Sequence, residues 1–184
     1  MQADSRRRAA PGTLLVCAFV LVLVSFTTAL ASPGPTGSAA ADRVAQAEAR
    51  FGPDSAEVLE PVTELAAATL AAGDVEGAEA LLQRADALLD RHPDDNLRLR
   101  VLILQSDRLV RLGRLSDGNQ ALYKAMKLAR GSEAIGPLSQ ANVLDRLAAS
   151  EGRRGRVSSG NTYTSDALKL REKHFGKDSP EFAA

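Results

Sequence analysis

The sequence is short of the residues on which catalytic and metal sites most often depend. Its 184 residues include one cysteine, two histidines, two tyrosines and no tryptophan. The single cysteine, Cys17, excludes an intramolecular disulfide framework and a zinc site built from several thiolates. No zinc-protease His-Glu-x-x-His pair, Gly-x-Ser-x-Gly nucleophile elbow or phosphate-binding P-loop occurs. We therefore expect a protein that is not an enzyme, with no catalytic residue, metal site or cofactor.

An excess of charge of one sign is also lacking. Lysine and arginine number 23, as do aspartate and glutamate. Proteins that bind nucleic acid usually carry a basic excess, so we expect no nucleic-acid partner. Alanine and leucine are abundant and aromatic residues few, which is typical of a packed all-helical protein. We interpret His92 and His174 as residues of a solvated junction and a helix end, and the basic turn at 152–156 as solvent-exposed.

Residues 1–31 have the layout of a secretory signal peptide. Three arginines precede an apolar run, which ends in small residues at Ala29 and Ala31. We expect cleavage between Ala31 and Ser32 and export to the periplasm or out of the cell. The alternative is an uncleaved anchor formed by residues 13–31, because about 18 apolar residues are enough to cross a bilayer. Only in that case would the membrane be a partner.

A spacer and a repeat region follow the apolar segment. Residues 32–41 are rich in proline, glycine, serine and alanine and lack apolar periodicity, which predicts a flexible linker. We expect a helical repeat domain over residues 42–176 and a C-terminal tail over 177–184. The segment 41–51 is expected to form a leading helix.

Three glycines mark an internal repeat. Gly73, Gly113 and Gly155 are separated by 40 and 42 residues, and small residues recur at fixed distances from each glycine. These small residues are Ala66, Ser106 and Ala148 before the glycines, and Ala78, Gly118, Gly160, Ala85, Ala125 and Ala167 after them. A stretch with helical periodicity lies on each side of every glycine, which predicts three antiparallel helix pairs. We place these hairpins at about 55–90, 95–130 and 135–174.

One phrase occurs twice, as FGPDSAEV at residues 51–58 and FGKDSPEF at 175–182. We interpret each copy as a junction in which glycine ends one helix and aspartate or serine caps the next. After the second copy only two residues remain, so we expect the C-terminal end of the repeat array to lack a covering helix.

This set of small and large residues around each glycine resembles the tetratricopeptide repeat over about residues 59–172. The repeat length and the FG-x-D-S phrase resemble the long variety found in kinesin light chains. Gln105, Glu151 and Thr164 depart from the pattern, because each replaces a residue that is usually apolar. The resemblance implies an all-α superhelix of about three helix pairs with a leading helix, acting as a non-catalytic adaptor.

The resemblance also implies a concave surface lined by the first helix of each pair. The expected inward residues are Glu60, Thr63, Arg100, Ile103, Asp107, Arg111, Asn142, Asp145 and Arg153. Arg100, Arg111 and Arg153 could together receive a carboxylate or an acidic peptide of a protein partner. The alternative interpretation is an ordinary solvated face. A second function also stays open, in which the uncovered C-terminal end joins copies of a structural module of the cell envelope.

Overall fold

The structure is a computed structural model that describes residues 35–177, 179 and 180. The described residues form helices and no strand, which confirms the predicted all-α class. In chain order the helices are α1 (Pro35–Phe51), the short 3-10 helix η1 (Ala56–Val58), α2 (Leu59–Ala71), α3 (Val75–Arg91), α4 (Asp95–Arg111), α5 (Leu115–Gly131), α6 (Pro137–Arg153) and α7 (Val157–Phe175).

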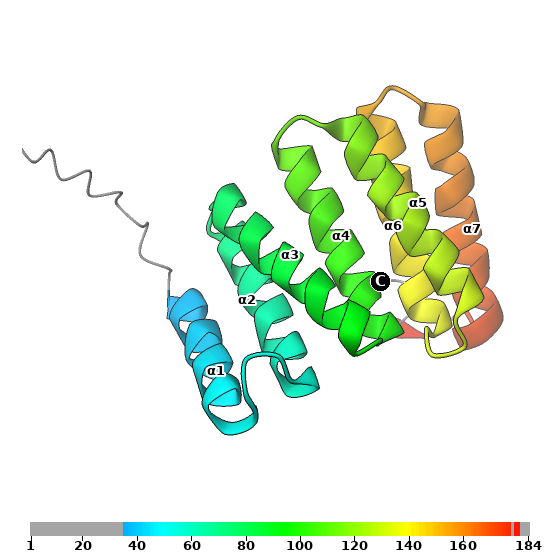
Figure 1. The fold of residues 1–184 in the computed structure, drawn as a ribbon. Helices are drawn as coiled ribbons and strands as arrows, with labels where there is room; N and C mark the ends of the chain where they lie inside the picture. The colour runs from blue at the N-terminus through cyan, green and yellow to red at the C-terminus, as the bar shows by residue number, and fades with distance from the viewer. Residues whose placement is uncertain (1–34, 178, 181–184) are drawn as a thin grey trace, which may run out of the picture. The chain divides into compact units, whose positions relative to one another are not determined.

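The helices pack as three successive hairpins, formed by α2 with α3, α4 with α5 and α6 with α7 (Figure 1). Helix α1 packs against α2, and each hairpin contacts the next through α3 with α4 and α5 with α6. Each helix therefore contacts its neighbours in sequence, as expected of a solenoid built from stacked helix pairs.

The hairpin turns depend on the three repeat glycines. Gly73, Gly113 and Gly155 have φ angles of 91°, 74° and 75°, in the left-handed region that only glycine adopts at little cost. The residue after each glycine donates its backbone N–H to a carbonyl five residues earlier, for example from Asp74 to Thr69 at 3.1 Å. This arrangement closes the first helix of each pair, as the sequence predicted.

Small residues allow the paired helices to approach closely. A Cβ atom placed on Gly118 would lie 3.1 Å from the carbonyl oxygen of Ser106, and one on Gly160 would lie 3.1 Å from that of Ala148. Both contacts join the second helix of a hairpin to the first. A larger side chain would push the two helices apart.

The apolar core divides at α4. Val101 faces a buried cluster contributed by α1, α2 and α3, whereas Leu99 faces a cluster contributed by α5, α6 and α7. Fully buried alanines, Ala85 and Ala125, lie in these clusters on α3 and α5. Because both clusters include side chains of α4, this helix connects the two halves of the core.

The first FG phrase forms the turn between α1 and α2. Gly52 has a φ angle of 91° and ends α1, as predicted. Asp54 or Ser55 was expected to cap the next helix, but no side-chain capping hydrogen bond is formed at the start of η1 or of α2. The turn is held from the end of α3 instead, because Arg91 pairs with Asp54 at 2.9 Å and His92 Nε2 lies 2.8 Å from the Asp54 carbonyl oxygen.

The beginning of the folded region differs from the prediction. Residues 35–41 belong to α1, so the part of the predicted 32–41 linker that the structure describes is helical. Pro35 occupies the start of the helix, where its missing N–H costs nothing, and three alanines at 39–41 favour helix, with Ala40 buried. Composition suggested a spacer, but these alanines form part of a packed helix.

The expected signal segment, its cleavage residues Ala31 and Ser32 and the alternative anchor at 13–31 lie outside the described residues. Within residues 35–177, 179 and 180, no helix combines the length and apolar character needed to cross a bilayer.

Candidate functional site: the inner helical face

The predicted inward residues lie on the first helices of the three hairpins, α2, α4 and α6. On α4, Arg100, Ile103, Asp107 and Arg111 follow one another at intervals of three or four residues. This spacing places them on one side of the helix, which we call the inner face together with the matching sides of α2 and α6.

Most charges on the inner face are paired within the protein. Glu60 on α2 lies 3.5 Å from Arg100 on α4. Between the second and third hairpins, Arg146 on α6 donates two hydrogen bonds to Asp107 on α4, at 2.7 and 2.8 Å. These pairs connect successive first helices, so they leave fewer groups for a partner than the sequence suggested.

Two predicted residues on α6 bind an arginine that the prediction missed. Arg171 of α7 is buried and donates hydrogen bonds to Asn142 at 3.1 Å and to Asp145 at 2.5 Å. Arg171 lies sixteen residues after its repeat glycine, where the other hairpins have Leu89 and Ala129. An arginine at an apolar repeat position was the sequence signal that could have revealed this contact.

Of the remaining predicted residues, some are buried in the core and others are exposed without an ion-pair partner among the described residues. Thr63 is fully buried and donates to the Leu59 carbonyl at 2.9 Å, so its assignment to an accessible surface was wrong. Ile103 is partly buried against the core. Arg111 and Arg153 are exposed and form no ion pair with any described residue. Each lies two residues before its repeat glycine, so the two cations occupy equivalent places on adjacent hairpins.

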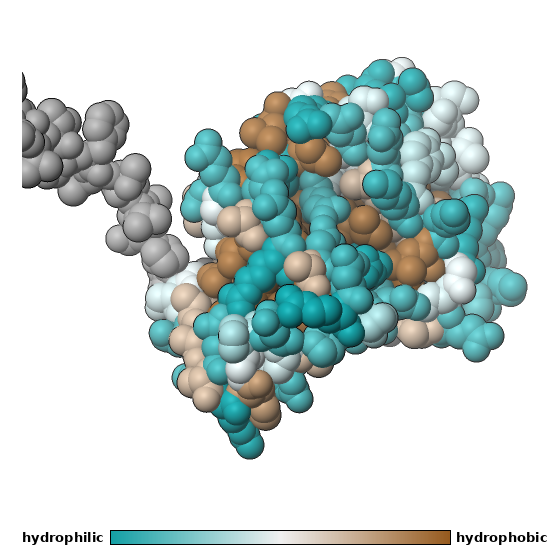
Figure 2. Space-filling view, in the orientation of Figure 1, coloured by the Kyte–Doolittle hydropathy of each residue, from teal (hydrophilic) through white to brown (hydrophobic). Residues whose placement is uncertain are grey.

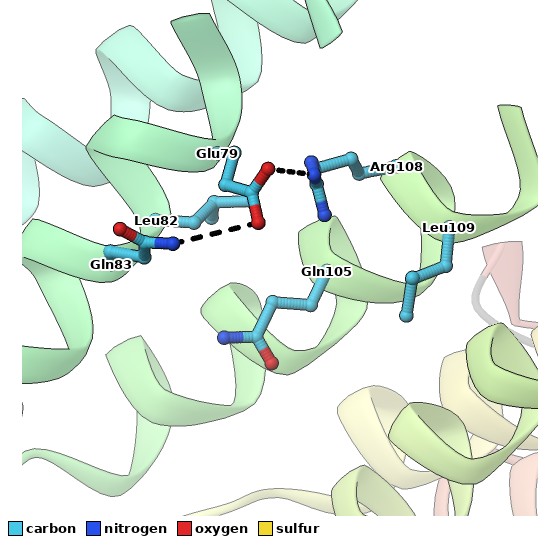
Figure 3. A pocket seen from close by; sticks show the side chains of 6 residues that line it. All are labelled: Glu79, Leu82, Gln83, Gln105, Arg108 and Leu109. Atoms are coloured by element: carbon cyan, nitrogen blue, oxygen red, sulfur yellow. Dashed lines mark hydrogen bonds and ion pairs between the residues drawn. The ribbon is translucent and has the colours of Figure 1, made fainter. Parts of the chain in front are cut away.

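A small cleft lies between α3 and α4, away from these inner-face residues (Figure 3). It has a volume of about 210 Å³. Its lining residues are Glu79, Leu82, Gln83, Gln105, Arg108 and Leu109. Glu79 and Arg108 point toward each other and form an ion pair, and Arg108 also donates to the Val75 carbonyl at 3.2 Å.

Asp86 lies on α3, about one helical turn after Gln83 of the cleft. Burial raises the pKa of its carboxyl group, while a hydrogen bond of 2.5 Å from Gln105 and the charges of Arg98 and Lys124 act in the opposite direction. Gln105, which replaces the usual apolar residue, therefore stabilises a partly buried carboxylate at the junction of the first two hairpins.

The next junction, between α5 and α6, contains a buried carboxylate. Glu151 is 1% exposed, and its Oε1 accepts hydrogen bonds from Asn119 at 2.6 Å, Tyr123 at 3.1 Å and Arg154 at 3.2 Å. The Tyr123 hydroxyl also lies 3.2 Å from that of Tyr163. The hydrogen bond with Tyr163, burial and the nearby Glu151 carboxylate raise the pKa of Tyr123 to about 12.

The polar groups of these two junctions pair mainly with one another within the protein. Among the described residues, no group of three or more histidine, cysteine, aspartate or glutamate side chains is arranged to hold a metal ion. The accessible, unpaired groups on the inner face are cations, and their chemistry suits the binding of carboxylates.

The fold is that of tetratricopeptide-like repeats. The structure resembles BtubC (BKLC) from P. vanneervenii, with a TM-score of 0.67, 20% sequence identity and coverage of 80% of this chain and 60% of that one. It also resembles a Podospora anserina putative kinesin light chain with nearly identical TPR-like repeats, with a TM-score of 0.60, 18% identity and coverage of 79% and 70%. No protein-family model and no curated protein sequence matches the chain.

Proposed function

We propose that this protein is a non-catalytic scaffold that binds a protein or peptide through the inner face of α2, α4 and α6. The observation that carries the proposal is the pair of free cations Arg111 and Arg153. They lie at the same repeat position of adjacent hairpins, whereas Arg100 and Arg146 are paired with acidic residues.

The chemistry of this pair indicates a partner with carboxylates. A guanidinium group binds a carboxylate through two parallel N–H groups, which gives both affinity and orientation. Two such groups on neighbouring hairpins suit an extended acidic peptide whose side chains reach both. The paired residues around them would fix the width of the inner face rather than contribute binding groups.

A crosslinking pull-down with purified protein and an envelope extract tests the proposal. We expect the double substitution Arg111→Ala, Arg153→Ala to abolish capture of the polypeptides retained by the unmodified chain, with the helical circular dichroism unchanged. Lys177→Ala is the matched control, because Lys177 is exposed and pairs with Glu172 in its own segment. Equal capture by the double variant would reject the inner face as the binding surface.

We also propose that residues 1–31 direct export and are removed after Ala31. The proposal is supported by the order of arginines, apolar run and small residues. Mass spectrometry of protein recovered from the envelope should find Ser32 as the first residue. Recovery of the full chain in the membrane fraction would favour the alternative anchor at 13–31.

Self-association is a second candidate, favoured by apolar side chains on α7. Val157 is 62% exposed and Leu168 is 43% exposed. Asn161, Thr164 and Ser165 are exposed on the same helix, so the apolar surface is interrupted by polar groups. Sedimentation velocity over a range of concentrations distinguishes the two: a monomer at every concentration would argue against self-association.

A further inference from the structure

A second surface lies on the opposite side of α4 from the inner face. Arg98 and Leu102 follow the helical spacing that places them across the helix from Arg100 and Asp107. Here α4 lies between α3 and α5 (Figure 1). A hollow of about 480 Å³ opens at this place, and we call it the outer groove. Its lining residues are Asp95, Arg98, Leu102, Lys124, Lys127, Leu128, Gly131 and Ser132.

The floor of the outer groove is apolar. Leu102 and Leu128 are partly buried and pack against the core cluster shared by α5, α6 and α7. Figure 2 shows hydrophobic surface among hydrophilic side chains over this part of the molecule. An apolar side chain placed here would cover surface that the protein's own chain leaves partly exposed.

The rim of the outer groove carries free positive charge. Lys124 and Lys127 are exposed and form no ion pair with any residue that the structure describes, although the charge of Lys124 also acts on the nearby carboxyl group of Asp86. The other charged groups of the groove are already engaged: Arg98 pairs with Asp90 at 3.1 Å, and Asp95 accepts a hydrogen bond from Ser132 at 2.5 Å. The groove therefore offers an apolar floor and two lysines, one turn apart on α5.

On the first hairpin the same repeat positions are covered by α1, which packs against α2 as α3 packs against α4 on the second hairpin. Val62 and Leu88, which correspond to Leu102 and Leu128, are buried in one cluster with Val44 of α1. Arg84, which corresponds to Lys124, pairs with Glu48 of α1. One helix thus supplies an apolar side chain and, four residues later, a carboxylate.

A second hollow on the other side of α5 has a similar apolar floor but a different arrangement of charges. It has a volume of about 280 Å³, and its floor includes Leu144 and Leu170, at the repeat positions of Leu102 and Leu128. Arg130 and Lys173 line it and form no ion pair within the described part of the chain. At the repeat positions of Lys124 and Lys127, however, the hollow has Asp166 and Lys169, which pair with each other at 4.0 Å. Of the two hollows, the outer groove alone has, at both of these repeat positions, cations that are unpaired among the described residues.

We propose that the outer groove binds an acidic amphipathic segment of a partner protein. The segment would place an apolar residue on Leu102 and Leu128, and a carboxylate one helical turn away against Lys124 and Lys127. Because α3 already packs against α4, the segment would lie in the part of the groove that α3 leaves open. The spacing of its apolar and acidic side chains would be that of Val44 and Glu48 in α1. The neighbouring carboxylates of Asp90 and Asp95 disfavour a uniform polyanion such as nucleic acid or an anionic membrane, because they would repel it. The apolar floor likewise suits a peptide side chain.

The test uses a labelled synthetic peptide with the 17-residue sequence of α1, in which Arg43→Glu and Arg50→Glu make it acidic while Val44 and Glu48 are kept. We expect saturable binding in a fluorescence anisotropy titration with the full chain. The double substitution Lys124→Glu, Lys127→Glu should weaken binding by about tenfold or more, because repulsion replaces attraction at the carboxylate. The milder Lys124→Ala, Lys127→Ala variant should weaken it less.

Two controls separate binding in the outer groove from binding at the inner face and from attraction by charge alone. The double variant Arg111→Ala, Arg153→Ala should bind the peptide with unchanged affinity. The proposal for the outer groove is therefore tested independently of the proposal for the inner face. A peptide with Val44→Asp should lose most of its affinity if the apolar floor is used. Absence of saturable binding, equal affinity of the lysine variants, or lysine-dependent binding to vesicles of anionic phospholipid without peptide binding would each overturn the proposal.

Discussion

The two junctions between hairpins occupy the same place in the repeat but are built from different groups. Between α3 and α4, Leu109 lines a cleft that Glu79 and Arg108 bridge. Between α5 and α6, the residue at the position of Leu109 is Glu151, which is buried and bonded to Asn119. An aliphatic side chain in one junction is thus replaced by a carboxylate in the other.

The difference shows that the repeat determines the positions at which helices contact each other, but not the type of side-chain interaction at those positions. The carboxylate of Glu151 is held by the side chains of two helices, so it defines the relative position of α5 and α6. The ion pair of the first junction borders a cleft, so water has access to it. We infer that the second junction is the more rigid of the two. Two changes test this inference directly, and two more test single groups at the junctions.

The largest expected effect comes from Glu151→Ala. Removing the carboxylate leaves Asn119 and the largely buried Arg154 without their partner, and such a loss typically costs about 3 kcal/mol. Urea denaturation should show this decrease in the free energy of unfolding. Glu133→Ala, at an exposed glutamate, is the matched control and should change stability little. A Glu151 variant as stable as the control would contradict a rigid second junction.

Glu79→Ala in the first junction should cost less, about 1 kcal/mol. Glu79 is half-exposed, Arg108 keeps its hydrogen bond to the Val75 carbonyl, and water can enter the cleft beside the freed guanidinium. The same urea experiment measures the difference. If Glu79→Ala destabilised the protein as much as Glu151→Ala, the two junctions would be energetically alike.

Asp86→Asn should increase stability slightly at neutral pH. Burial raises the pKa of Asp86, so the folded state retains the proton more strongly than the unfolded chain and loses stability as pH rises through the folded pKa. Asparagine is always neutral and can still accept the hydrogen bond from Gln105. The gain should therefore disappear in acid, where Asp86 is itself protonated; a constant gain at all pH values would point to another cause.

The smallest change concerns the titration of Tyr123. The chain has two tyrosines and no tryptophan, so phenolate absorbance follows these two groups alone. In Tyr163→Phe the pKa of Tyr123 should fall from about 12 toward 10, because its hydrogen bond with Tyr163 is the largest cause of the increase. An unchanged titration of Tyr123 would show that the hydroxyl pair is not formed. In the unmodified chain, stability arising from this shift is complete below pH 10 and is lost as pH rises toward 12.

Local features of the fold were predictable because their causes lie in adjacent residues. A left-handed turn at Gly73 requires glycine, and close contact at Gly118 requires the absence of a side chain, so both leave a signal at fixed positions. The candidate site was less predictable. The helical spacing identified the side of α4 that carries Arg100 and Asp107, but it could not show that Glu60 and Arg146 already pair with them.

The errors have the same physical origin. Thr63 occupies an inward repeat position, yet the packing of the first hairpin buries it. Asp145 was expected to face a partner, but it binds Arg171, which is distant in sequence and adjacent only after α7 folds back on α6. Helix α1 begins earlier than predicted because burial of Ala40 stabilises a segment whose composition suggested a spacer.

By itself, the sequence determined the class of fold, the repeat and the positions of the repeat glycines. These features follow from periodicity and from the backbone freedom of single residues. Only the tertiary structure decided which charges are free. Pairing depends on distances between side chains of different helices, and a change of a few ångströms separates an ion pair from an unpaired cation. The sequence named Arg100, Arg111 and Arg153 as candidate binding arginines, but only the placed helices showed that Arg100 is paired and that the other two are not paired with any described residue. Likewise, only the placed helices showed that Lys124 and Lys127 form no ion pair with the described residues.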